Sequence, residues 1–150
     1  MKKPINESEK RILNTLIKDS RKSYRELAKE SKVSVATISN KLKEFKNNGI
    51  LKAYTTLVDY DLLGYEVHVI INIRVSQGQE VVVGKKLFNS PNVTAIYDLT
   101  GEFDIMVIAR FKNRRELDNY LKTVQAYEFV ERTQTQLILS SVKEMPIIIS

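Results

Sequence analysis

Three segments in the first fifty residues carry apolar side chains at the three-to-four-residue spacing of an amphipathic helix. The first, which Asn6 or Ser8 can cap, has a stripe made of Ile12, Leu13, Leu16 and Ile17. The second is short and opens on Ser23 and Glu26, the spacing of a capping box. The third begins at Ser34, ends at Gly49, and has an arc expected to point inward, made of Val35, Ile38, Leu42 and Phe45. A tight turn between the second and third segments predicts a helix-turn-helix.

From residue 50 onward the pattern becomes that of strands alternating with helices. Residues 50–58 are rich in β-forming side chains and predict a linking strand, with a turn over 59–64. Apolar residues occupy every second position of residues 65–75, so one face of the predicted strand carries Val67, Val69, Ile71, Ile73 and Val75. Next come a helix over 79–89, strands over 93–99 and 104–111, a helix capped by Asn113, and a strand over 130–142. The first of these helices should turn inward Val83, Leu87 and Phe88.

The order of the second half is therefore β-α-β-β-α-β, the ferredoxin-like arrangement. The whole chain is α+β, with a winged-type helix-turn-helix unit of three helices followed by that sheet. We expect a helix-turn-helix domain over residues 1–52, a linker over 53–64, and a second domain over 65–150.

Charge is divided unevenly between these halves. Residues 1–52 hold 14 Lys and Arg against 6 Asp and Glu, a net of +8, and residues 53–150 hold 10 against 12, a net of −2. A basic unit joined to a slightly acidic one is typical of a nucleic-acid-binding module attached to another function, although a solubilising surface gives the same count.

Composition excludes several classes of site. The chain has no cysteine, so disulfides and thiolate metal sites are absent, and no apolar run long enough for a membrane span or a signal peptide. A cytoplasmic protein fits best. His68 is the single histidine, so we predict no metal site and no cofactor. Asp98, Glu102 and Asp104 lie close in sequence, but no activated nucleophile or phosphate-binding loop accompanies them, and we predict that the protein is not an enzyme.

The outer face of the third helix has the chemistry needed to enter a major groove of double-stranded DNA. Ala36 and Asn40 point outward, opposite its apolar arc, Thr37 and Ser39 flank them, and Ser34 caps the helix at the same end. Asn40 suits an adenine edge, and the methyl groups of Ala36 and Thr37 suit a thymine methyl. The basic residues suited to phosphates are Arg25, Lys32, Lys41, Lys43 and Lys46.

The sequence resembles the Lrp/AsnC family of transcription regulators over nearly its whole length. In the first unit the resemblance rests on residues 11–13, on Ser23 to Ala28, and on the stretch from Val33 through Ile38 and Leu42 to Ile50. In the second unit it rests on Thr100-Gly101-Glu102-Phe103-Asp104 and on residues 130–135. The chain departs from the family at Lys32, where many members have glycine, and at Lys41, where arginine is common. We expect Lys32 to adopt a left-handed backbone at some cost.

The resemblance implies a C-terminal domain that senses a small effector, commonly an amino acid, and that forms dimers which often assemble into octamers. It implies an effector site at Thr100, Gly101, Glu102, Phe103 and Asp104, with Thr133 and Thr135 from a neighbouring subunit. The loop chemistry agrees, because Gly101 allows close approach and Asp104 offers a carboxylate to an ammonium group, although Asp104 serves equally as a structural turn residue. The alternatives are a nonspecific architectural DNA-binding protein and an amino-acid-binding regulatory subunit of an enzyme.

Overall fold

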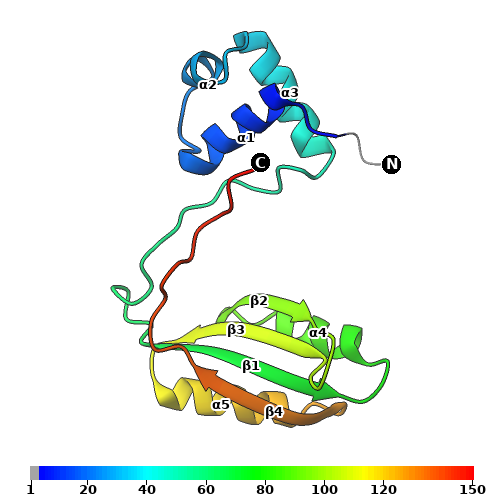
Figure 1. The fold of residues 1–150 in the computed structure, drawn as a ribbon. Coiled ribbons are helices and arrows are strands. Elements are labelled where there is room, and N and C mark those ends of the chain that lie inside the picture. The colour runs from blue at the N-terminus through cyan, green and yellow to red at the C-terminus, as the bar shows by residue number, and fades with distance from the viewer. Residues whose placement is uncertain (1–3) are drawn as a thin grey trace. The chain divides into compact units, whose positions relative to one another are not determined.

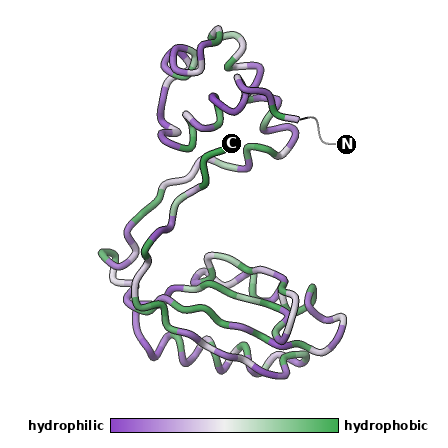
Figure 2. Tube along the Cα trace, viewed as in Figure 1, coloured by the Kyte–Doolittle hydropathy of each residue, from purple (hydrophilic) through white to green (hydrophobic). Residues whose placement is uncertain are grey.

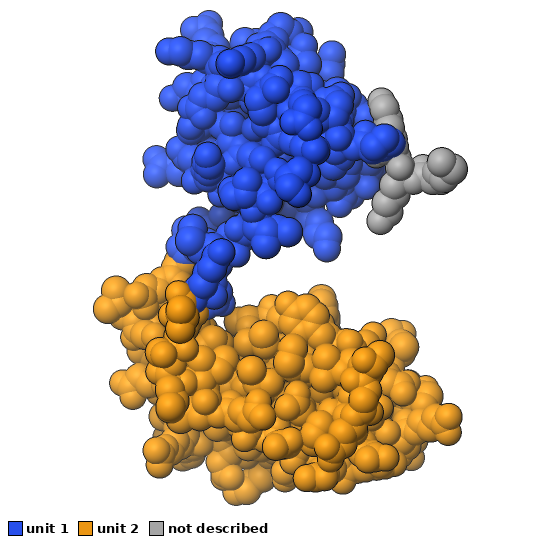
Figure 3. Space-filling model, viewed as in Figure 1, with its two compact units in different colours: residues 1–57, 143–150 blue, residues 58–142 orange. Residues whose placement is uncertain are grey.

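The computed structural model describes residues 4–150 and divides the chain into two compact units (Figure 3). The first contains the chain up to Leu57 together with Lys143–Ser150, and the second is Val58–Val142. The segment Lys143–Ser150, which the sequence grouped with the second domain, thus packs in the first unit. Each unit has its own hydrophobic core.

Three helices form the first unit: α1 (Glu7–Lys18), α2 (Tyr24–Ser31) and α3 (Val35–Asn47) (Figure 1). Each begins at a residue whose side chain accepts a hydrogen bond from the third backbone N–H of the helix, namely Asn6, Ser23 and Ser34. In α1 and α2 a glutamate completes a reciprocal capping box. The core lies between the helices and includes Ile12, Leu27, Ile38 and Phe45, each almost fully buried.

Two predictions about this unit are wrong. Val35, expected to point inward, is 44% exposed, because it is the first residue of α3 and lies at the margin of the core that Ile38 and Leu42 enter. Residues 50–58 are not a strand, since none of the described strands of this chain forms a ladder with them. The turn that follows is present: Leu63 and Gly64 donate backbone hydrogen bonds to Tyr60 and Asp61, and Gly64 has a φ of +80°.

The second unit is a four-stranded antiparallel sheet in the order β2-β3-β1-β4, which is the ferredoxin-like topology (Figure 1). Its elements are β1 (Val67–Val75), α4 (Glu80–Phe88), β2 (Val93–Asp98), β3 (Ile105–Phe111), α5 (Arg114–Gln125) and β4 (Val130–Leu137). β4 ends at Leu137, five residues before the predicted boundary at residue 142, and the regular register with β1 ends at the same residue.

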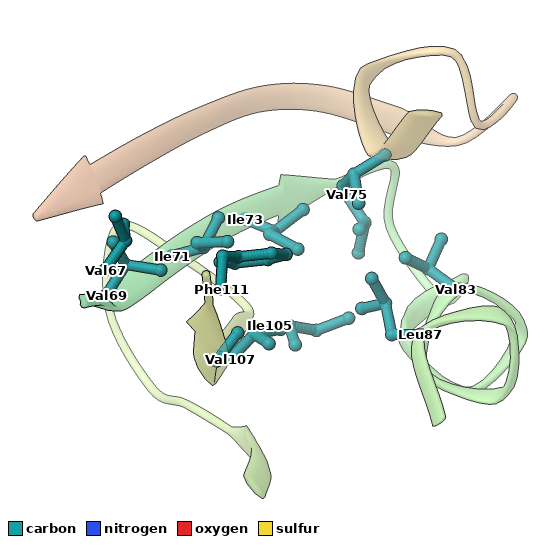
Figure 4. Close-up of a cluster of buried hydrophobic side chains, with 12 residues drawn as sticks. Val67, Val69, Ile71, Ile73, Val75, Val83, Leu87, Ile105, Val107 and Phe111 are labelled. Atoms are coloured by element: carbon teal, nitrogen blue, oxygen red, sulfur yellow. The ribbon is translucent and has the colours of Figure 1, made fainter. Parts of the chain in front are cut away.

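The core of this unit lies between the helices and one face of the sheet. Every second residue of β1 and β3 is buried, and Val83 and Leu87 of α4 point toward these strands (Figure 4). Phe88, predicted to point inward, is 79% exposed, because the residue that follows Leu87 on a helix turns away from the face that Leu87 buries.

The opposite face of the sheet has no helix of this unit over it. The strand register places Ile70 beside Ile108 and Tyr97 beside Met106 on that face, with Ala95 next to Ile108. Ile70, Met106 and Ile108 are all half-buried. This open face combines an apolar centre with polar residues nearer its margins, including Arg132 and Gln136 of β4.

Candidate DNA interface and ligand loop

The turn between α2 and α3 is a compact left-handed connection. Lys32 has φ 57° and ψ 46°, as the sequence predicted, and the N–H of Val33 donates to the carbonyl of Ala28 at 3.0 Å. This six-residue closure is a Schellman-type helix end, and the side chain of Val33 packs against the core. The turn thereby fixes the angle at which α3 leaves α2, with Lys32 exposed at its tip.

The first turn of α3 is held by its own side chains. Ser34 Oγ accepts from the N–H of Thr37 at 3.0 Å and lies 2.8 Å from the Thr37 hydroxyl. Ala36 and Asn40 are exposed, and Thr37 and Ser39 are half-buried. Among the described residues none bonds to the Asn40 amide, so both its donor and its acceptor are available to a ligand.

The predicted basic residues separate into two groups. Arg25, Lys32, Lys43 and Lys46 are exposed, as a phosphate contact requires. Lys41 Nζ instead lies 2.6 Å from Glu9 of α1 and 2.7 Å from Glu44 of its own helix. Its hydrogen bonds to Glu44 and Glu9 raise the pKa of Lys41 above its ordinary value of 10.5.

The ion pair between Lys41 and the buried Glu9 links α3 to α1. The Glu9 side chain is only 5% exposed, and its other oxygen accepts from the backbone N–H of Asn6 in the α1 capping box. A carboxylate buried to this extent needs a cation close by. Lys41 supplies that cation and ties α3 to α1. The sequence pattern did not reveal the pair, because 32 positions separate its members.

In the second unit, the loop between β2 and β3 folds back onto the end of β1. The N–H of Asp104 donates to the carbonyl of Ile73 at 3.1 Å, and the Asp104 carboxylate accepts from the N–H of Val75 at 2.8 Å. Asp104 therefore has a structural contact through one carboxylate oxygen. Gly101 has φ +118°, a conformation that favours glycine.

This loop also contacts β4, through an arginine that sequence reasoning missed. Arg132 lies 3.1 Å from the Glu102 carboxylate and 5.6 Å from the centre of the Phe103 ring. Its partner in the register, Arg74 of β1, lies 3.5 Å from Glu131. Alternation placed Arg74 on the polar face of its strand, but only the pairing of β1 with β4 shows that it lies near the loop.

A polar cavity of about 340 Å³ opens beside the loop. Its lining includes three of the predicted effector residues, Gly101, Glu102 and Asp104, and adds Arg74, Val75, Gln77, Glu80 and Glu131. Four carboxylates against one guanidinium make the cavity acidic, which suits a ligand ammonium group, and Arg74 suits a ligand carboxylate.

Among residues 4–150, no group of His, Cys, Asp and Glu is arranged to hold a metal ion, and none of the helices combines the length and the apolar composition of a membrane span.

Within one chain the two threonines predicted for the effector site lie away from this cavity. Thr133 and Thr135 pair with Ile73 and Ile71, on the face of the sheet that the helices cover. Thr133 Oγ1 accepts a hydrogen bond from Gln125 of α5 at 2.9 Å. Thr135 lines a separate hollow of about 760 Å³ between α5 and the edge of the sheet.

Comparison with known proteins assigns the two units to a family. A model of winged helix-turn-helix DNA-binding domains matches residues 5–52, and the model of the Lrp/AsnC ligand binding domain matches residues 68–148, more than half of the chain. The chain belongs to the Lrp/AsnC family. Among the proteins that it resembles is an uncharacterized HTH-type transcriptional regulator of Pyrococcus horikoshii, 40% identical over 137 residues, 91% of this chain and 92% of the relative. The regulator FL11 of Pyrococcus furiosus is 34% identical over 140 residues, 93% of each chain.

Solved structures of the Lrp/AsnC type agree. AsnC of E. coli has a TM-score of 0.87 at 27% identity, covering 97% of this chain and 99% of AsnC. A Neisseria meningitidis regulator solved as its complex with L-Met has the same fold, with a TM-score of 0.86 at 19% identity, covering 95% of this chain and 94% of the regulator. The protein is a DNA-binding transcription regulator with a ligand-binding domain, and its relatives are regulators rather than enzymes.

Proposed function

We propose that α3 reads a defined DNA sequence in the major groove, with Asn40 as the principal base-contacting residue. The observation that carries this proposal is the exposed Asn40 amide, to which none of the described residues bonds. An asparagine with both amide atoms free can pair with the N6 and N7 atoms of adenine. Ala36 is exposed beside it, and the half-buried Thr37 and Ser39 flank the two near the first turn of the helix.

Arg25, Lys32, Lys43 and Lys46 then position the helix by contacting phosphates, while Lys41 serves the fold. Selection of bound sequences from a random DNA pool tests the proposal. The expected result is an enriched sequence with two similar half-sites about one helical turn apart, because a dimer presents two copies of α3. Recovery of an unenriched pool would instead identify a nonspecific architectural protein.

For the second unit, we propose that the acidic cavity beside Gly101, Glu102 and Asp104 binds an amino acid. The ligand ammonium group meets Asp104 and its neighbouring carboxylates, and the ligand carboxylate meets Arg74 or a backbone N–H of the loop. The fold shared with a regulator solved with L-Met supports this assignment. Thr100 and Phe103 complete the loop, and Thr133 and Thr135 enter the site only if a neighbouring subunit presents them.

Calorimetry with the twenty amino acids is the test, applied to the wild type, Asp104→Asn and Asp104→Ala. Asn keeps an oxygen that accepts from Val75 but lacks the charge, whereas Ala removes both. Loss of binding in both variants assigns the carboxylate to the ligand. Binding that persists unchanged in Asp104→Asn, or that no amino acid shows, contradicts the proposal.

We further propose that two copies pack their open sheet faces together as a dimer. Ile70, Ile108 and Met106 are half-buried on a face that no helix of the unit covers, and a second sheet of the same kind is complementary to it. The dimer brings two DNA-binding units to adjacent half-sites. Assembly of such dimers into an octamer stays a prediction from the family resemblance.

A further inference from the structure

The last residues of the chain pack in the DNA-binding unit although they follow the last strand of the other unit. Ile149 is half-buried against the core that includes Leu13 and Leu16 of α1, and with Pro146 it lines a cavity of about 500 Å³ beside that helix. The matched ligand-domain model ends at residue 148, one position short of Ile149. This end of the chain is strongly hydrophobic (Figure 2).

Two hydrogen bonds fix the position of Ile149. The Asn14 side chain donates from Nδ2 to the carbonyl of Ile149 at 2.9 Å and accepts at Oδ1 from its N–H at 2.8 Å. The amide therefore replaces a neighbouring strand for this one residue. Asparagine has a low helix propensity, so Asn14 lowers the stability of α1. The two hydrogen bonds to Ile149 offset this cost.

The contact is specific to one residue of the segment. Ile147 and Ile148 are 82% and 54% exposed, and Met145 is 70% exposed. Docking therefore does not follow from apolar character alone, since three apolar neighbours remain in solvent. The combination of the Asn14 pair and the core contact selects Ile149.

The docked segment follows the last strand of the second unit, and that strand contacts the loop between β2 and β3. Glu102 and Phe103 contact Arg132, which lies on β4. β4 ends at Leu137, Ile138 donates to His68 at 2.8 Å, and the chain then runs on to the docked residues.

We propose that residues 143–150 form a strap that docks on α1 through Asn14 and Ile149, and that docking favours the DNA-binding form of the protein. The strap continues covalently from the ligand domain and is held on the DNA-binding domain by the non-covalent contacts of Asn14 and Ile149, whereas residues 52–66 join the two domains covalently. The part concerning DNA rests on the proposed function, whereas the docking itself does not. The two parts are therefore tested separately.

Docking is tested without DNA or ligand, by amide hydrogen exchange at Ile149 and in α1 of the full-length protein. Asn14→Ala should speed exchange at Ile149 by about three- to tenfold, since it removes both hydrogen bonds. Ile149→Ala should do the same to the α1 amides, and Ile147→Ala is the matched control that should change neither. Equal exchange in Ile149→Ala and Ile147→Ala would overturn the docking.

The connection to DNA binding is tested by affinity for a selected site. Ile149→Ala and Asn14→Ala should each weaken binding by about three- to tenfold, and the double variant should be no weaker than the stronger single one, because both remove one contact. By reciprocity, bound DNA should slow exchange of the Ile149 amide. Additive losses, or exchange that DNA leaves unchanged, would contradict the role of the strap. A protein that binds no specific DNA but shows the docking result would fail the proposed function alone.

Discussion

Replacing Lys32 by glycine should stabilise the DNA-binding unit against unfolding and lower its affinity for DNA. Lys32 has φ 57° and ψ 46°, a left-handed conformation that costs an L-residue roughly 1–2 kcal/mol. Glycine removes that cost but adds about 0.4–1 kcal/mol of freedom to the unfolded chain. The net gain is about 1 kcal/mol, which for a domain of this size raises Tm by roughly 4–8 °C.

Lys32→Ala is the matched control, because it removes the same ammonium group and keeps the strained backbone. The assay is denaturant unfolding of both variants, followed by binding to a selected DNA site at several salt concentrations. Both variants should lower the salt slope by roughly 0.9 if Lys32 contacts one phosphate, but only glycine should gain stability. A glycine variant no more stable than the alanine variant would refute the strain argument.

Three other results are expected. The Ser23 hydroxyl, and to a lesser extent the Ser23 backbone N–H, donate hydrogen bonds that hold the pKa of Glu26 below its ordinary 4.5. The capping box formed by Ser23 and Glu26 therefore stabilises the fold above that pH. Its contribution is lost as the pH falls through the lowered pKa, and acid titration of unfolding should show a smaller loss in Glu26→Gln, which cannot take up the proton. Asp104→Ala should lower the free energy of unfolding by about 1 kcal/mol, because the Val75 N–H loses its acceptor. Asp104→Asn should lower it clearly less in the same thermal unfolding assay, and equal losses would contradict the contact. Ile108→Glu should yield a monomer in light scattering at micromolar concentration, since it places a charge on the open face, and a wild type that is itself monomeric there would contradict the proposed dimer.

Features that depend on neighbouring residues in sequence were predictable. Asn6, Ser23, Ser34 and Asn113 each cap the expected helix, because a cap uses atoms within three residues. The alternation in β1 likewise identified its buried face. The left-handed backbone of Lys32 was expected from the family resemblance, because many members have glycine at this position.

Features that depend on residues far apart in sequence were not predictable. Val35 fits the helical pattern but lies at the start of α3, at the margin of the core, and Phe88 is the last residue of α4, turned away from the face that Leu87 buries. Residues 50–58 have strand-forming side chains without a strand beside them in this chain. Lys41 meets Glu9, Arg132 meets Glu102, and Ile149 meets Asn14 across 135 positions, and no local pattern reveals such pairs.

The loop from Thr100 to Asp104 entered the candidate site through the family resemblance, whereas the charged residues that line the cavity beside it were not predicted. Arg74, Glu80 and Glu131 line the cavity because of the strand register and the start of α4, which the order of elements does not specify. The outer face of α3 was accessible to sequence reasoning, because helical periodicity alone separates Asn40 and Lys43 from Ile38 and Leu42.

The most direct test of base reading by α3 compares Asn40→Ala with Lys43→Ala on a selected site and on random DNA. Asn40→Ala should lose about 1–3 kcal/mol of binding free energy on the selected site and little on random DNA, with relaxed preference at one base pair. Lys43→Ala should weaken binding to both by similar amounts and lower the salt slope. An Asn40→Ala variant that loses affinity equally for selected and random DNA would contradict sequence reading by this helix.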